Sequence, residues 1–140
     1  MATDLEAVFT ALAVLERTIT GVKAAHDKTP EKLIDLPAFI NFPSRGETTF
    51  GPWHQMEGYY TIIAELHVAR ANLPIAETVA RPFLNRFEDL LSNDVTISGT
   101  VETINALRSS YGTLTYGIGT DAVAHLGWRF EIDIKIRRNI

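Results

Sequence analysis

The sequence predicts an α+β protein, a two-layer sandwich in which two helices pack on one face of a mostly antiparallel sheet of four to five strands. Two amphipathic stretches with helical spacing, each followed by segments of strand character, give the order helix, strands, helix, strands. The clearest single signal is the last stretch, Leu126–Ile140, where apolar and charged residues alternate. A period of two indicates a strand with one buried and one solvated face.

Each face of this closing strand has its own predicted role. The apolar face should complete the core of the sheet, and it comprises Trp128, Phe130, Ile132, Ile134 and Ile136. The charged face should meet solvent or a neighbouring subunit, and it comprises Arg129, Glu131, Asp133, Lys135 and Arg137. Mixed signs on such a face favour a role in setting the register of a contact more than its affinity.

The first helix is predicted over Asp4–Ile19, with an apolar stripe that starts at Leu5. Thr3 followed three residues later by Glu6 has the form of a capping box, and Gly21 stands where a helix stops.

Three extended segments follow the first helix. Val22–Ala25 is predicted as a short strand, and Leu36–Phe42 as an extended segment that Pro43 closes. Tyr59–Arg70 is the longest strand candidate, with its alternate residues on one apolar side. A polar connection, Asp27–Asp35, separates the first two.

The second helix is predicted to open at Asn72–Pro74, with an apolar stripe of Ile75, Val79, Phe83, Phe87, Leu90 and Leu91. Pro82 predicts a kink or a late start, because proline removes a backbone donor. After a turn region at Ser92–Gly99, Val101–Ser110 has features of both helix and strand. Strand is favoured by its Val, Thr and Ile residues, and Tyr111–Tyr116 is a further strand candidate.

Composition limits the class of protein. The 140 residues fit a single domain over 1–140, and 46% hydrophobic with 21% charged residues is typical of a folded soluble chain. A formal net charge of -4 argues against a nucleic-acid-binding surface. The absence of cysteine excludes disulfides and thiolate chemistry. No apolar window is long enough to span a membrane, and Met1–Glu6 lacks a signal-peptide pattern, so we expect an intracellular protein.

Few residues suggest chemistry. The four histidines have no pair at the spacing of two ligands on one helix face, so no metal site is predicted. Glu65 and His67 share one face of a predicted strand, and that spacing could orient a general acid or base or supply two metal ligands. A polar outer face on a half-buried strand is the favoured explanation. Asp121 and His125 are a weaker pair near a loop. We predict no catalytic, cofactor-binding or metal-binding residues.

The segment Ser44–Gly58 is predicted as a long loop or an extended hairpin, and it is rich in glycine and large apolar residues. Exposed aromatic residues and methionine in such a segment are typical of a contact surface, which makes Phe50, Trp53, Met56 and Tyr59 candidate interface residues. The alternative is that the segment folds back and covers the core of its own domain.

Taken in order, these stretches resemble the tail terminator, or tail completion, proteins of long-tailed bacteriophages. The resemblance spans most of the chain, and it rests on the opening Ala-Val-Phe-Thr-Ala-Leu, Leu36–Pro43, Ala80–Phe83, the stretch from Tyr111 and the stretch from Leu126. It implies a two-layer α+β subunit that forms a ring, commonly a hexamer, which caps the tail tube and joins it to the neck.

The resemblance therefore implies a structural role in the virion, without catalysis or cofactors, after assembly in the host cytoplasm. The implied partners are further copies of the chain, the tail tube protein and a neck or connector protein. No membrane and no sequence-specific nucleic acid is implied, and DNA passing through the lumen is compatible with the role. Two alternatives stay open: another head-tail connector or stopper protein, and a small intracellular enzyme or ligand-binding domain that uses Glu65 and His67.

Overall fold

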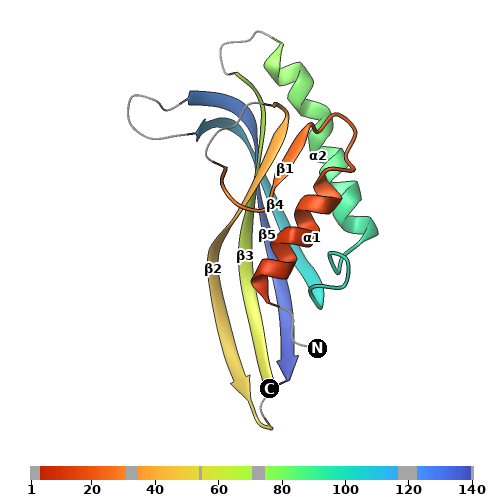
Figure 1. The fold of residues 1–140 in the computed structure, drawn as a ribbon, viewed down its shortest axis with the longest axis vertical. Helices are drawn as coiled ribbons and strands as arrows, with labels where there is room; N and C mark the ends of the chain where they lie inside the picture. The colour runs from red at the N-terminus through yellow and green to blue at the C-terminus, as the bar shows by residue number, and fades with distance from the viewer. Residues whose placement is uncertain (1–3, 31–34, 54, 71–74, 117–122, 140) are drawn as a thin grey trace.

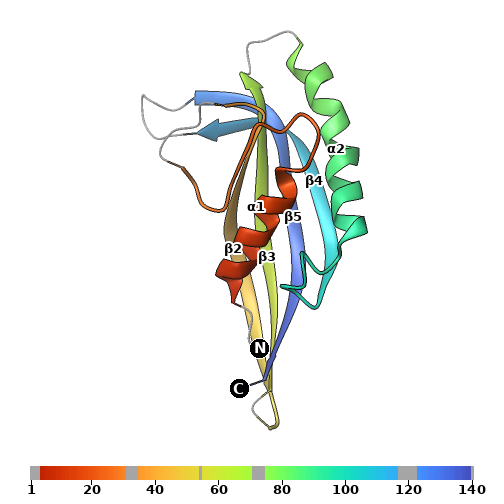
Figure 2. The ribbon, with the colours of Figure 1, turned by 45° about the vertical axis from the view of Figure 1, so that its right-hand side comes forward.

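The computed structural model describes residues 4–30, 35–53, 55–70, 75–116 and 123–139 (Figure 1). Its elements are α1 (Leu5–Glu16), β1 (Ala24–His26), β2 (Ala38–Gly51), β3 (Gln55–Arg70), α2 (Ala76–Asn93), β4 (Thr103–Tyr116) and β5 (Val123–Asn139). They form one five-stranded sheet of order β1-β2-β3-β5-β4, in which β1 and β2 are parallel and the other neighbours antiparallel. Both helices pack on the same face (Figures 1 and 2), which confirms the predicted class.

The core lies between this face and the two helices. Three phenylalanines form its centre, because the Phe87 ring of α2 lies 4.3 Å from that of Phe130 and 5.2 Å from that of Phe39. The apolar face of β5 is buried as predicted, with Phe130, Ile132 and Ile134 at 0% exposure. Trp128 is partly buried, and its indole nitrogen donates a 2.9 Å hydrogen bond to the Ala80 carbonyl of α2.

The helix α1 is shorter than predicted. It ends at Glu16, before Ile19, and it is capped by Asp4, whose side chain accepts a 2.9 Å hydrogen bond from the Ala7 N–H. Thr3, which was predicted as the cap, lies outside the described residues. Gly21 has φ 96°, a conformation that favours glycine, and it sits in the turn that follows α1.

The helix α2 starts at Ala76 and continues through Pro82, so a late start is wrong. Its buried face is also rotated from the predicted stripe, because Ile75 and Val79 are 65% and 41% exposed. The buried residues follow one helical stripe with alanine at its first two positions: Ala76, Ala80, Phe83, Phe87 and Leu91. The small alanines permit the close approach that the Trp128 contact requires.

The predicted strands are present with shifted ends. The first is β1, one to two residues later than expected, and β2 runs past Pro43 to Gly51 with a register shift between Pro43 and Arg45. Proline is tolerated there because β1 pairs with β2 only as far as Ile40, which leaves the outer edge of β2 unpaired among the described residues. The two later strand candidates merge into β4.

The closing strand, β5, does not lie at an edge of the sheet. It lies between β3 and β4 and forms a backbone ladder with each of them. In the described part of the chain the unpaired edges belong to β1, to β4, to β2 beyond Ile40 and to the end of β5 beyond Lys135. Up to Lys135 the backbone of β5 is paired on both sides, so this part of the strand cannot pair with a strand of another subunit.

Candidate interaction surface on a protruding arm

Three strands continue past the helices and form a projection that we call the arm. It consists of residues 44–51 of β2, 55–61 of β3 and 133–139 of β5, joined by ladders on both sides of β3. Figures 1 and 2 show the arm at the lower end of the molecule, where the β2 and β3 strands meet in a hairpin. The predicted Ser44–Gly58 segment is therefore an extended hairpin and not a loop folded over the core.

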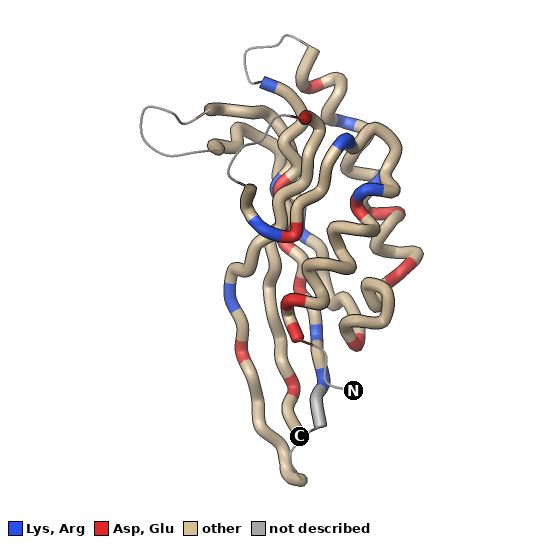
Figure 3. The backbone as a smooth tube through the Cα atoms, in the orientation of Figure 1, with Lys and Arg blue, Asp and Glu red and all other residues tan. Residues whose placement is uncertain are grey.

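The tip of the arm carries the most exposed aromatic side chains. Trp53 is 89% exposed, Phe50 is 76% exposed and Tyr59 is 39% exposed, while Met56 is partly buried. From Thr48 to Met56 the sequence has no Lys, Arg, Asp or Glu, so the tip appears uncoloured in Figure 3. An uncharged aromatic tip held away from the core has the composition of an interface centre.

The pairing of β2 with β3 shows that the four predicted interface residues do not all lie on one face of the arm. Phe50 is paired with Met56, which places both on the helix-bearing face of the sheet, and Trp53 lies in the turn with φ 62°. Tyr59 lies on the opposite face, where its hydroxyl donates a 3.2 Å hydrogen bond to Glu57. Phe50, Trp53 and Met56 therefore form the apolar tip, whereas Tyr59 belongs to the charged face.

The arm is stiffened by the ring of Tyr60. Gly46 of β2 lies directly opposite Tyr60, and Gly58 lies two residues before it on β3. A Cβ atom on either glycine would overlap the tyrosine ring. The hydroxyl of Tyr60 also lies 3.2 Å from Thr48 Oγ1. A tyrosine lying over two glycines replaces the packing that those residues lack, which supports a regular ladder.

The charged residues of β5 are paired within the subunit. Arg129 contacts Glu65 at 2.9 Å, and Arg108 of β4 contacts Glu131 at 3.0 Å and Asp133 at 2.7 Å. Lys135 and Arg137 each lie within 4.0 Å of both Glu57 and Glu102. All five predicted charged residues thus have partners on or beside β3 and β4, where they set the register between strands of one chain.

This pairing shifts the acidity of its members. Two hydrogen bonds and the positive charge of Arg108 lower the pKa of Asp133, and a further bond comes from Thr61 at 2.7 Å. Hydrogen bonds from Arg137 and Tyr59, with the charge of Lys135, lower the pKa of Glu57. Both carboxylates are partly exposed to solvent, where screening limits the contribution of such ion pairs to stability.

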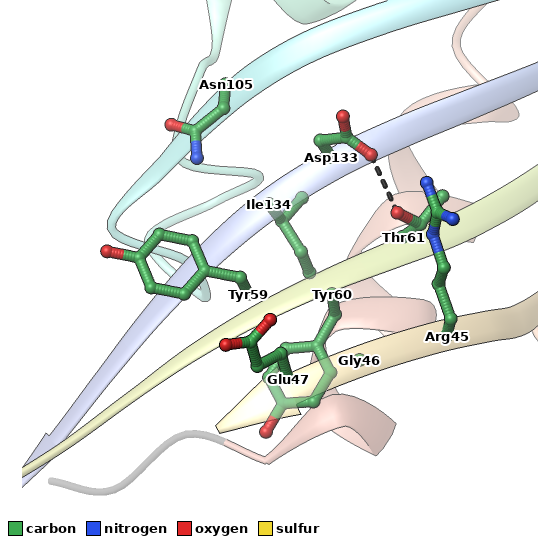
Figure 4. A pocket seen from close by; sticks show the side chains of 9 residues that line it. All are labelled: Arg45, Gly46, Glu47, Tyr59, Tyr60, Thr61, Asn105, Asp133 and Ile134. Atoms are coloured by element: carbon green, nitrogen blue, oxygen red, sulfur yellow. Dashed lines mark hydrogen bonds between the residues drawn. The ribbon is translucent and has the colours of Figure 1, made fainter. Parts of the chain in front are cut away.

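A hollow of about 420 Å³ lies beside the base of the arm (Figure 4). Its lining includes positive, negative and neutral polar side chains, which come from Arg45, Glu47, Tyr59, Thr61, Asn105 and Asp133. Figure 4 shows Asp133 accepting the hydrogen bond of Thr61 at one side of this hollow. This mixed lining offers no matched set of donors or acceptors for one class of ligand.

Glu65 and His67 lie together on the face opposite the helices, as predicted. Their contact is 3.3 Å between Glu65 Oε1 and His67 Nε2, but His67 is completely buried instead of facing solvent. Other residues on this end of the same face are buried as well: Ala38, Ile40, Ile63 and Leu114. Neither Glu65 nor His67 lines the hollow beside the arm or the two further cavities at the start of α1 and beside the end of α2.

Two polar pairs were not predicted. His125 lies against His67, with 2.9 Å between their Nδ1 atoms, and Glu16 of α1 accepts a 2.6 Å hydrogen bond from Asn41 of β2. Asp121, the suggested partner of His125, lies outside the described residues. No sequence pattern could have found either pair, because each joins separate elements of the fold.

Comparison with known proteins adds no relative: neither a scan against protein-family models nor a search of curated proteins finds a match. Within the described residues, neither helix is both long and apolar enough to cross a membrane. The same residues contain no group of three or more histidine and acidic side chains arranged to hold a metal ion.

Proposed function

We propose that the chain is a structural subunit of a bacteriophage tail terminator, which assembles with copies of itself into a ring, binds the end of the tail tube and joins it to the neck. The observation that carries this proposal is the arm, whose uncharged tip holds Phe50 and Trp53 in solvent. A soluble subunit gains nothing in its own stability from aromatic side chains in that position. Burial against a partner accounts for them.

A closed ring needs two different surfaces on each subunit, since the contacts run head to tail. The tip supplies one such surface. The outer edge of β4, which has no strand partner in the described chain, is a second exposed surface some distance along the sheet. Because these surfaces differ, a contact between them leads to a ring or a filament and not to an isolated pair.

The role we propose is without catalysis. Both ring nitrogens of His67 are already in contact with protein groups, one with His125 and the other with Glu65. Glu65 is in turn held by Arg129. Because these groups already have hydrogen-bond or ion-pair partners within the chain, a structural role is supported for them, although they were the best acid and base candidates in the sequence.

Electron microscopy of the protein mixed with polymerised tail tubes tests this proposal. We expect rings at one end of the tubes with the wild-type chain, and far fewer with Trp53→Ala, because the tip loses an aromatic anchor of the kind that dominates interfaces. The melting temperature of Trp53→Ala should stay within a few degrees of wild type, since Trp53 is 89% exposed.

Val14→Ala is the matched control, because Val14 is an exposed apolar residue on α1, 52% accessible and away from the arm. It should cap tubes as the wild type does. Rings that bind a neck protein but never a tube would indicate a connector or stopper. Equal capping of tubes by the wild type and Trp53→Ala would show that Trp53 at the tip is not part of the interface.

A further inference from the structure

His67 and His125 meet on the sheet face opposite the helices, and we call them the histidine pair. Their Nδ1 atoms are 2.9 Å apart, and the two rings are nearly perpendicular at 87°. His67 is 0% exposed and His125 is 4% exposed. Two imidazoles in direct contact inside a protein are an uncommon use of the residue that titrates nearest to neutral pH.

The ladder between β3 and β5 brings the pair together. His67 is opposite Gly127, and His125 lies two residues further along the same face of β5. A register shift follows His67, and Gly127 approaches the Leu66 carbonyl so closely that a Cβ atom would collide with it. Glycine at this position therefore allows the close approach of β3 and β5 at the histidine pair.

The hydrogen bond between the rings restricts their protonation. One Nδ1 must carry a hydrogen and the other must offer its lone pair, because a donor cannot bond to a donor. The pair can therefore hold one Nδ1 proton between its rings. A second proton at this contact would place two positive rings side by side without exposure to water, which costs free energy.

Charged groups around the pair favour a charge on one ring at most. Glu65 of β3 faces His67 through its Nε2, and Arg129 of β5 already neutralises that carboxylate. Arg70, at the end of β3, adds positive charge near His125. From β4 the facing side chain is the ring of Tyr116, edge-on to His67 at 6.2 Å.

We propose that His67 and His125 form an acid-sensitive lock that holds the ends of β3, β4 and β5 together at neutral pH and opens when both rings become protonated. The lock ties the start of β5 to β3, and Tyr116 connects it to the end of β4. Its opening would release this end of the sheet while the three-phenylalanine core stays packed. It is independent of any assembly into a ring.

The sign of the pH effect follows from proton binding. In the unfolded chain both rings titrate near pH 6.5. In the fold, burial lowers the pKa of His125, and the charges of His67 and Arg70 lower it further. The open form therefore binds more protons below about pH 6.5, and each additional proton favours opening about tenfold per pH unit.

Amide hydrogen exchange of Val123–Gly127 measures this opening. We expect protection of these amides in the wild-type chain to fall at least about tenfold between pH 7 and pH 5, after correction for intrinsic exchange rates. His125→Asn should abolish that fall, because the asparagine amide nitrogen can occupy the place of Nδ1 and donate to His67 without titrating. His26→Asn is the matched control and should keep the acid response.

A second readout does not depend on any variant. Nitrogen-15 NMR of wild-type histidine rings near pH 7.5 should show a proton on one Nδ1 of the pair and a bare, hydrogen-bonded Nδ1 on the other. Protection that is equal at pH 7 and pH 5, or two bare Nδ1 atoms that titrate independently, would overturn the lock.

Discussion

Glu16 is a carboxyl group with 0% exposure at the end of α1, beside the equally buried Asn41 of β2. Asn41 donates to Glu16 Oε1 at 2.6 Å and to the His26 carbonyl at 3.0 Å. Among the described residues, Glu16 Oε2 and Asn41 Oδ1 have no hydrogen-bond partner. A proton on Glu16 removes the cost of burying a negative charge at this site. We infer that the folded chain holds Glu16 in its neutral form.

Glu16→Gln tests this inference. Burial raises the pKa of Glu16 well above its usual range, so the folded state binds more protons than the unfolded state between about pH 4.3 and the raised pKa. The stability of the wild-type chain should therefore fall as the pH rises from that value towards the raised pKa. The glutamine amide carries no charge at any pH, so the variant should match the wild type at low pH and exceed it near pH 8.

Denaturant unfolding across this pH range measures the difference. Glu16→Ala serves as the comparison, and it should lose about 1–3 kcal/mol because the buried Asn41 loses its hydrogen bond to Glu16 and keeps only the bond to the His26 carbonyl. Parallel pH profiles for the wild type and Glu16→Gln would show that Glu16 is ionised in the fold.

Single residues were the least predictable level of this protein. The helical stripe of α1 places Glu16 on the buried face, four residues after Leu12, but its partner Asn41 lies 25 residues away. His67 and His125 are 58 residues apart. Pairs of this kind depend on how strands align in space, and a single sequence contains no record of that alignment.

Among the elements, the arm depends on the packing of Tyr60 over its two glycines. Gly58→Ala should destabilise the chain by about 1–3 kcal/mol, because the added methyl group overlaps the Tyr60 ring and forces the side chain or the strand to move. Gly112→Ala is the matched control on β4, where an added Cβ atom meets nothing within 4 Å. It should change stability by less than about 0.5 kcal/mol.

Thermal or denaturant unfolding of both glycine variants checks this prediction. A loss that is equal at Gly58 and Gly112 would mean that glycine is required in these strands for general reasons and not for the tyrosine contact. A neutral Gly58→Ala would show that Tyr60 can leave its place without cost.

The sequence predicted elements in proportion to the regularity of their patterns. Strict alternation identified β5 and the burial of Phe130, Ile132 and Ile134. The stripe of α2 was misplaced because Ile75 and Val79 are more hydrophobic than Ala76 and Ala80, yet the alanines face the sheet. Close packing selected small residues there, and hydrophobicity alone gives no sign of that choice.

At the scale of the whole molecule, the order of strands changes the account of assembly. The charged face of β5 was predicted to meet solvent or a neighbouring subunit, and the structure shows β5 between β3 and β4 with its charges paired within the chain. Strand order is set by long-range packing that local patterns do not encode. The surfaces that we propose for the contact between subunits are the tip at Phe50 and Trp53 and the outer edge of β4.

The molar mass of the purified chain in solution, measured by light scattering over a wide concentration range, tests the central claim most directly. The ring account predicts a discrete species at one fixed multiple of the 15.6 kDa subunit, which is favoured as the concentration rises or when tail tubes are added. A chain that stays at 15.6 kDa at every concentration, with and without tail tubes, would contradict it.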